Sequence, residues 1–289
     1  MKPDNSVPFN QIRNYRKCIT DAVKIVSHFP PRLVKRLCIV WGLSAVALAA
    51  MLYLFIWSTH IMAFVFEVFL LLAVLLLQST GLVILGRYVS WLKSGCAEAT
   101  FGKFPLRKTQ MRSILSFLLL RVGQVLSLLL LVAVMQWLGA SAMAAQITAA
   151  VVFAVIAYFD VYLVGNSFLQ AGGLKGSAVS AIRCCLKHIG TTFLIYVTTG
   201  FFILVAVVVF YTPTFILACG MGAQKFSVQI GDSPVSVSLW AHFVNIVLII
   251  CAFVVTNALF SISRMAAALF ENSRFLSREE MAAQAKGQA

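Results

Sequence analysis

The distribution of positive charge along the chain constrains its fold more than any other feature of the sequence. The 23 Lys and Arg residues, except Arg121 and Lys225, fall in every second gap between six long apolar stretches. Cytoplasmic loops of membrane proteins carry an excess of Lys and Arg. The alternation therefore predicts an all-α, polytopic membrane protein with six transmembrane helices in three hairpins and with both termini in the cytoplasm.

The composition of the 289-residue chain agrees with a membrane location. Hydrophobic residues make up 61% of the chain and the mean hydropathy is +0.94, whereas soluble domains are about 45–50% apolar. The net charge of +14 is not gathered into one basic stripe with interleaved aromatic residues, which argues against nucleic acid as a partner. We expect anionic lipid headgroups to contact the basic loops.

Each apolar stretch approaches or exceeds the roughly 20 residues that a helix needs to cross a bilayer. Neither a secretory signal peptide nor an Asn-x-Ser/Thr acceptor is evident, which favours a bacterial inner membrane. We predict three domains, namely a cytoplasmic segment (1–37), a membrane domain (38–262) and a cytoplasmic tail (263–289). The predicted spans are 38–57, 61–86, 113–138, 143–165, 191–217 and 240–262.

Short helices are expected outside the spans. Residues 8–29 place Ile12, Ala22 and Val23 on one side and basic residues with Asp21 on the other, which predicts a basic amphipathic helix in the headgroup plane. The same helix could instead pack on protein. A second helix is expected at 177–188, and Ser277 with Glu280 forms a capping box that predicts a last short helix.

The sizeable outer loop, residues 218–239, contains two short alternating patterns. Phe226, Val228 and Ile230 alternate with polar residues, and a similar pattern follows the turn cluster at 231–234. Alternation around a turn predicts a small β-hairpin. Because an isolated hairpin is marginal in water, we expect it to rest on helix ends or on a partner.

Three ionisable residues lie inside the predicted spans, namely Glu67, Arg121 and Asp160. A charge at the bilayer centre costs at least about 2.5–3.5 kcal/mol, so each requires a reason. Arg121 and Asp160 lie roughly 12 and 8 Å from the inner ends of consecutive spans. We predict an ion pair between them, which is either a structural clamp or a gate or ion site.

Glu67 lies near the outer end of its span, in the other leaflet. His60 precedes it by two helical turns, and His242 is at a similar depth in the sixth span. Such a set could bind a metal or relay protons, although a lone Glu with a raised pKa is the commoner case. We assign no metal, cofactor or catalytic residue.

Catalytic motifs are not evident, since the chain contains no phosphate-binding loop, no zincin motif and no nucleophile elbow, and no family signature is recognised. We predict a non-enzymatic accessory or scaffold subunit that docks lipid or protein partners at the cytoplasmic face. Its protein contacts are expected to be with a partner or, in a homo-oligomer, with copies of itself. The alternative is a small transporter or channel that uses Glu67, Arg121 and Asp160. A membrane enzyme with His60, Glu67 and His242 at the outer face ranks last.

Overall fold

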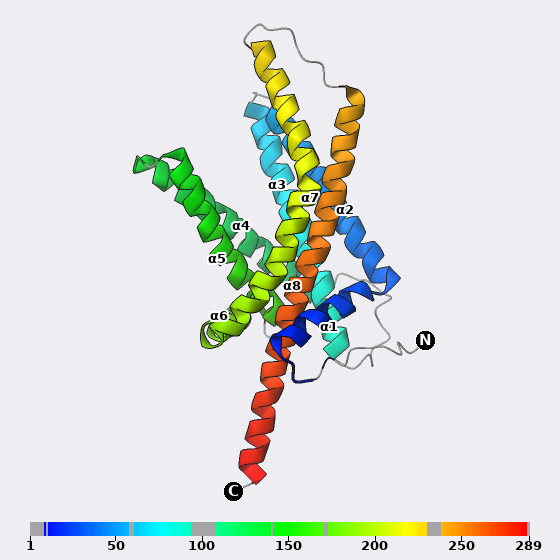
Figure 1. Ribbon diagram of the computed structural model, residues 1–289, viewed down its shortest axis with the longest axis vertical. Helices are drawn as coiled ribbons and strands as arrows, with labels where there is room; N and C mark the ends of the chain where they lie inside the picture. The colour runs from blue at the N-terminus through cyan, green and yellow to red at the C-terminus, as the bar shows by residue number, and fades with distance from the viewer. Residues whose placement is uncertain are drawn as a thin grey trace. The chain divides into compact units, whose positions relative to one another are not determined.

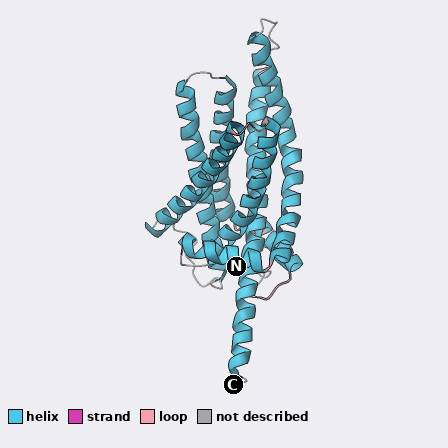
Figure 2. Cartoon of the chain, turned by 90° about the vertical axis from the view of Figure 1, so that its left-hand side faces the viewer, coloured by secondary structure: helices cyan, strands magenta, loops and turns pink. Residues whose placement is uncertain are grey.

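The computed structural model describes residues 9, 11–57, 61–93, 108–139, 141–169, 173–229 and 238–287. Helices account for nearly all of these residues, and the described part contains no strand (Figures 1 and 2). The helices are α1 (Tyr15–Ser27), α2 (Pro31–Trp57), α3 (Ile61–Lys93), α4 (Lys108–Trp137), α5 (Ala142–Leu169), α6 (Gly173–Lys187), α7 (Ile189–Gln229) and α8 (Leu239–Gly287).

Among the described residues, six helices are long and apolar enough to cross a membrane. They are α2, α3, α4, α5, α7 and α8, and each overlaps one predicted span. Large apolar side chains stay exposed on their surfaces, as at Phe64 (65% exposed) and Phe201 (60% exposed). A helix that is apolar on all sides requires lipid or protein around it. These features confirm a multi-pass helical membrane protein.

The chain forms two compact units that do not follow the predicted hairpins. Unit 1 comprises Met1–Phe29, Leu82–Thr199 and Ser261–Ala289, and unit 2 comprises Pro30–Gly81 and Gly200–Phe260. Because α3, α7 and α8 each contribute to both units, the structure does not support the three-hairpin arrangement. A short turn joins two helices that follow each other in the chain, but side-chain packing determines which helices share a core. The domain limits at 37 and 262 stay a sequence-based prediction.

The core of unit 1 is built around its segment of α8. Met265, Ala266, Ala267, Ala268 and Leu269 are 0% exposed. Within the same unit α4 and α5 run side by side (Figure 1), and α6 packs on α5. Small residues in this segment of α8 let a neighbouring backbone approach closely.

The close approach to α8 is made by α5 at Gly165. A Cβ atom at Gly165 would lie 3.1 Å from the Ala267 Cβ, 3.1 Å from the Ala268 backbone nitrogen and 3.2 Å from the Arg264 carbonyl oxygen. Two of these three atoms belong to backbone, which cannot rotate away. Glycine at this position therefore holds α5 against α8, and it does so close to the charged residues described below.

In unit 2, α2 contacts both α3 and α8. A Cβ at Gly81 of α3 would lie 3.1 Å from the indole nitrogen of Trp41 on α2. The Tyr53 hydroxyl of α2 donates a hydrogen bond of 3.1 Å to the carbonyl of His242 on α8. Buried hydroxyls such as Ser79 donate to the carbonyl four residues earlier in their own helix, which satisfies them without a polar neighbour.

The β-hairpin prediction is wrong for residues 218–229. These residues continue α7 to Gln229, so Phe226 and Val228 belong to the last turns of a helix. Of the remaining residues of the predicted hairpin, 230–237 lie outside the described residues, and Leu239 is the first residue of α8. Three alternating apolar residues are too few to distinguish a strand from the end of a long helix. Pro213 also lies inside α7 without ending it.

The prediction of a separate last helix is also wrong. α8 continues without a break to Gly287, and the hydroxyl of Ser277 donates to the Ser273 carbonyl at 3.1 Å. Ser277 is therefore an interior helical residue and not an N-cap. The capping pattern occurs by chance wherever Ser and Glu stand three apart, and only a break in the helix makes it a start signal.

The N-terminal helix packs on protein with a face different from the predicted one. The buried residues of α1 are Cys18, Asp21, Ala22 and Ile25, whereas Ile12 is 48% and Val23 is 45% exposed. The buried face thus includes a carboxylate that the sequence pattern placed on the polar side. The reason is an ion pair made by that carboxylate, which hydrophobic periodicity does not reveal.

Candidate functional site

The structure contains the predicted ion pair between α4 and α5. Nη2 of Arg121 lies 2.8 Å from Oδ2 of Asp160. The Asp160 side chain is 6% exposed and that of Arg121 is 19% exposed, so water screens the pair poorly. A closed, hydrogen-bonded pair at this depth offsets much of the cost of removing both charges from water.

Gln124, one turn after Arg121, completes the hydrogen bonding. Its side-chain oxygen accepts from Nη1 of Arg121 at 2.9 Å, and its amide donates to Oδ1 of Asp160 at 3.3 Å. Both carboxylate oxygens therefore have a donor on α4. Gln124 was not among the predicted site residues, although its spacing from Arg121 puts both on one face of a helix.

A third charge, Arg264 of α8, belongs to this cluster and was missed by sequence reasoning. Arg264 is close enough to interact electrostatically with both Arg121 and Asp160. We call Arg121, Gln124, Asp160 and Arg264 the intramembrane charge cluster. Arg264 lies two residues beyond the predicted inner end of the sixth span, so the sequence analysis assigned it to the cytoplasmic tail.

A cavity of about 310 Å³ lies beside the cluster. Its walls are almost entirely apolar, and Gln124 and Asp160 are its polar lining residues. A carboxylate at the end of an apolar cavity can hold a polar or protonated group of a ligand while the walls exclude water. The lining residues come from α4, α5 and α6, namely Leu120, Gln124, Val155, Ile156, Phe159, Asp160, Leu163, Ala181 and Ile182.

The structure describes two members of the predicted outer set, Glu67 and His242. Glu67 is half-buried on α3, and the ring of His242 lies 5.7 Å from that of Tyr53. His60 lies outside the described residues. In the part of the chain that the structure describes, no group of three or more His, Cys, Asp and Glu side chains is placed to hold a metal ion.

A second cluster, also missed by sequence reasoning, fixes the N-terminal segment. Nε of Arg13 lies 2.7 Å from Oδ2 of Asp21, and the two side chains are 0% and 8% exposed. Nη1 of Arg13 also donates to the carbonyls of Phe9 and Gln11, at 2.9 and 3.0 Å. One guanidinium thus ties α1 to the chain that precedes it.

The same segment is tied to α8. The backbone N–H of Arg13 donates to Oγ of Ser273 at 2.7 Å, and this hydroxyl donates back to the Arg13 carbonyl at 3.3 Å. Nδ2 of Asn272 donates to the Phe9 carbonyl at 3.1 Å. We call this set of contacts, from Phe9, Arg13 and Asp21 to Asn272 and Ser273, the N-terminal latch.

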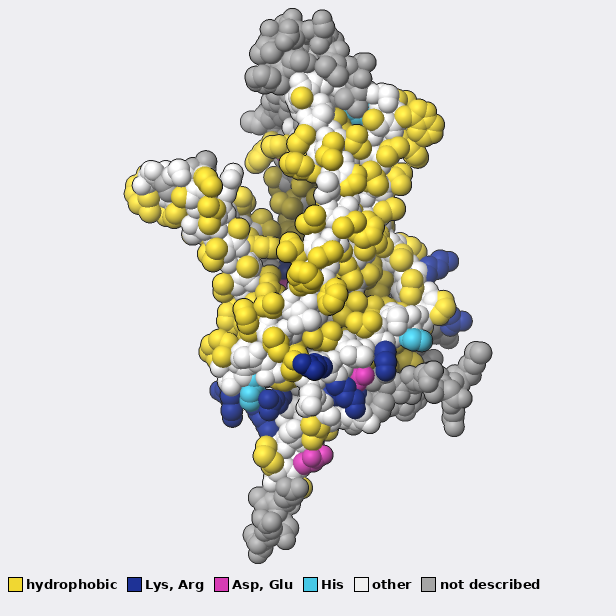
Figure 3. Space-filling view, in the orientation of Figure 1, with side chains coloured by type: hydrophobic (Ala, Val, Ile, Leu, Met, Phe, Trp, Pro, Cys, Tyr) yellow, Lys and Arg dark blue, Asp and Glu magenta, His cyan; other side chains and the backbone are white. Residues whose placement is uncertain are grey.

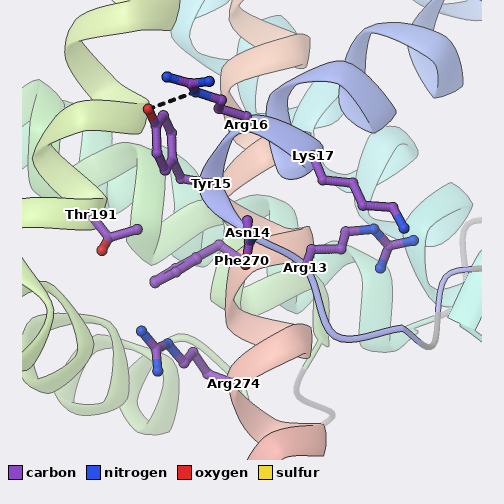
Figure 4. Close-up of a pocket in the computed structure, with 8 residues that line it drawn as sticks. All are labelled: Arg13, Asn14, Tyr15, Arg16, Lys17, Thr191, Phe270 and Arg274. Carbon is purple, nitrogen blue, oxygen red and sulfur yellow. Dashed lines mark hydrogen bonds between the residues drawn. The ribbon is translucent and has the colours of Figure 1, made fainter.

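Beside the latch lies a basic pocket of about 530 Å³ between α1, α7 and α8. On the face shown in Figure 3, Lys and Arg side chains gather around this end of unit 1. Figure 4 shows the guanidinium groups of Arg16 and Arg274 on either side of the Tyr15 and Phe270 rings. The lining residues are Arg13, Asn14, Tyr15, Arg16, Lys17, Thr191, Phe270 and Arg274.

Burial shifts the pKa of several titratable groups in unit 1. Burial raises the pKa of Cys18 to about 11 and that of Cys185 to about 12. Burial, followed by the charge of Arg274, lowers the pKa of His188. Among the residues that line the pocket, Arg13, Arg16, Lys17 and Arg274 are cationic and none is a carboxylate, which makes the pocket suitable for an anion.

Comparisons of the chain with protein-family models, with characterised proteins and with solved structures gave no match. The function must therefore be inferred from the two sites. One is a closed charge cluster inside the membrane domain, and the other is an open basic pocket held by the N-terminal latch.

Proposed function

We propose that the protein is a non-enzymatic subunit of a bacterial inner membrane, with both termini in the cytoplasm. In this role it is an accessory or scaffold protein that docks lipid or protein partners at its cytoplasmic face. The observation that carries the proposal is the N-terminal latch. By fixing α1 to α8 through buried hydrogen bonds, it holds Arg16, Lys17 and Arg274 around one pocket, and a fixed surface binds a partner at a lower entropic cost than a mobile one.

The interior of the described spans supports a docking role over transport. Transporters usually have broken helices and convergent polar groups near the middle of the membrane. Here the hydroxyls of Ser44, Ser79 and Thr256 donate to carbonyls of their own helices. The Arg121–Asp160 pair is closed and shares its hydrogen bonds with Gln124, as expected for a clamp between α4 and α5.

The test is affinity purification of the full chain from native membranes in mild detergent, followed by mass spectrometry. We expect a partner in stoichiometric amounts. Reversing two charges of the pocket, with Arg16→Glu and Lys17→Glu, should reduce recovery of a protein partner about tenfold or more. Lys24→Glu is the matched control, because Lys24 is exposed on the same helix but does not line the pocket. Recovery of the protein without any partner contradicts the accessory-subunit role.

A second candidate function, transport, is favoured by the intramembrane charge cluster and its cavity. Charged groups within spans mark ion or proton paths by default, and Glu67, Arg121 and Asp160 would line the path. Flux of ions or protons into liposomes that contain the purified protein alone would support this function and overturn the first proposal. Glu67→Gln should then abolish flux while the amount of folded protein stays unchanged.

A further inference from the structure

The basic pocket between α1, α7 and α8 has the features of a lipid-binding site. We propose that it binds the phosphate group of an anionic phospholipid, whose acyl chains lie along the exposed face of α7. The inference deepens the proposed function and rests on it, because it names lipid as the partner that the cytoplasmic surface docks.

The charges of the pocket are available to an anion. Within the described part of the chain, neither Arg16 nor Lys17 nor Arg274 forms an ion pair. Arg16 uses its Nε atom in a 2.9 Å hydrogen bond to the Tyr15 hydroxyl, which orients the guanidinium. The Arg274 guanidinium carbon lies 5.3 Å from the centre of the Phe270 ring. Guanidinium groups that are oriented in this way bind phosphate oxygens with two hydrogen bonds each.

The start of α1 adds backbone donors at the same place. Asn14 is the N-cap residue, but its side chain makes no capping hydrogen bond. The intrahelical hydrogen bonds begin with Cys18, whose N–H donates to the Asn14 carbonyl. The amides of Tyr15, Arg16 and Lys17 therefore have no acceptor within the helix, and helix N-termini of this kind favour phosphate.

The position of the pocket distinguishes a lipid from a soluble anion. Thr191 lines the pocket and lies in the first turn of α7, where a span begins. Leu194, one turn further, is 40% exposed, and Val197, the next turn on, is 46% exposed. Tyr15 lines the same pocket as Thr191, and aromatic residues gather at the boundaries of membrane spans. A phosphate in the pocket thus has an apolar surface directly beside it for acyl chains.

The experiment measures lipid retention by the delipidated full-length protein with native mass spectrometry. Phosphatidylglycerol and phosphatidylcholine of the same chain length are titrated in parallel. We expect one phosphatidylglycerol to bind about tenfold tighter than phosphatidylcholine, and Arg16→Ala with Arg274→Ala to remove this preference. Lys24→Ala with Arg278→Ala removes the same charge outside the pocket and should leave the preference intact. If the first double variant does not fold, Arg16→Gln alone should weaken phosphatidylglycerol binding severalfold.

Several outcomes would overturn the inference. Equal binding of the two lipids, or equal effects of the two double variants, removes the pocket from lipid recognition. Complete displacement of phosphatidylglycerol by excess inorganic phosphate assigns the site to a soluble anion, and tighter binding of an acidic peptide assigns it to a protein segment. If the unaltered protein shows no lipid preference although its protein partner is still recovered, this inference alone is contradicted. If no protein partner is recovered although the lipid preference is intact, the accessory-subunit proposal alone is contradicted.

Discussion

At the residue scale, Asp160 is the centre of the intramembrane charge cluster. Its two oxygens accept hydrogen bonds from Arg121 and Gln124, and Arg264 interacts with its charge from α8. Removing one partner of a buried ion pair leaves an uncompensated charge, which costs more than the pair contributes. The stability of unit 1 should therefore depend strongly on the charge at position 160.

We predict that Asp160→Arg and Arg121→Asp each destabilise the folded protein by about 3 kcal/mol. The double variant should recover most of this loss, because the opposite charges again face each other. The measurement is the thermal unfolding midpoint in detergent together with the yield of monodisperse protein. Gln124→Ala is the control and should cost less, since it removes hydrogen bonds to Arg121 (2.9 Å) and Asp160 (3.3 Å) but leaves both charges in place. Failure of the double variant to recover would show that the pair does not stabilise the fold.

A second prediction concerns the thiol of Cys18. Burial raises its pKa from 9.0 to about 11, so at pH 8 the thiolate fraction is about 100-fold lower than in the unfolded chain. Maleimide labelling of a variant with Cys18 as the sole cysteine should therefore be at least about 100-fold slower in the folded protein than in denaturant. The labelling rate of the unfolded chain should be half-maximal near pH 9 and level off about one pH unit higher, where that of the folded protein should still rise. Equal rates in both states would place Cys18 outside the packed face of α1.

At the scale of helices, Gly165 controls how closely α5 approaches α8. We predict that Gly165→Ala destabilises the protein by about 1–3 kcal/mol, because the added methyl group overpacks against the α8 backbone. Gly123→Ala on α4 is the matched control, since a Cβ there meets no atom within 4 Å. It should stabilise the protein by up to about 1 kcal/mol through helix propensity. Equal unfolding midpoints for the two variants would contradict the close approach.

The elements show where sequence reasoning succeeded and where it failed. The six spans could be predicted because about 20 consecutive apolar residues have no other stable solution in a bilayer. The end of α7 at Gln229 could not be predicted, since the spacing of Phe226 and Val228 fits a strand as well as a helix. Asp21 is buried because it forms an ion pair with Arg13, whose backbone N–H donates a hydrogen bond to Ser273. Neither contact produces a periodic pattern in the sequence.

At the scale of the whole molecule, the charge alternation predicts the orientation in the membrane. We expect a fluorescent protein fused after Gly287 to be bright in a bacterial host, because it folds in the cytoplasm. Alkaline phosphatase fused after Gly139 should be active, since this short turn between α4 and α5 is predicted to face outside. Gly139 has a φ of 78°, which makes it a tight turn residue. The opposite pattern of fluorescence and activity would invert the topology.

The arrangement of helices into units was beyond the reach of the sequence. The ion pair of Arg121 and Asp160 could be predicted, because depth along consecutive helices is readable from residue counts. The position of Arg264 beside this pair could not be predicted, because it depends on the packing of α8 against α5 at Gly165. Neither the basic pocket nor the N-terminal latch has a local motif, because their residues come from segments far apart in the chain.

The N-terminal latch also has a consequence for the order of events during synthesis. Arg13 and Ser273 are 260 positions apart, and ribosomes add about 5–20 residues per second. For a period on the order of 10–50 s, Arg13 and Asp21 have therefore been synthesised but Asn272 and Ser273 have not. A nascent chain in this interval offers an exposed, unfastened α1 to any targeting factor, and the emergence of α8 ends that opportunity. Closing of the latch would thus report that membrane insertion is complete.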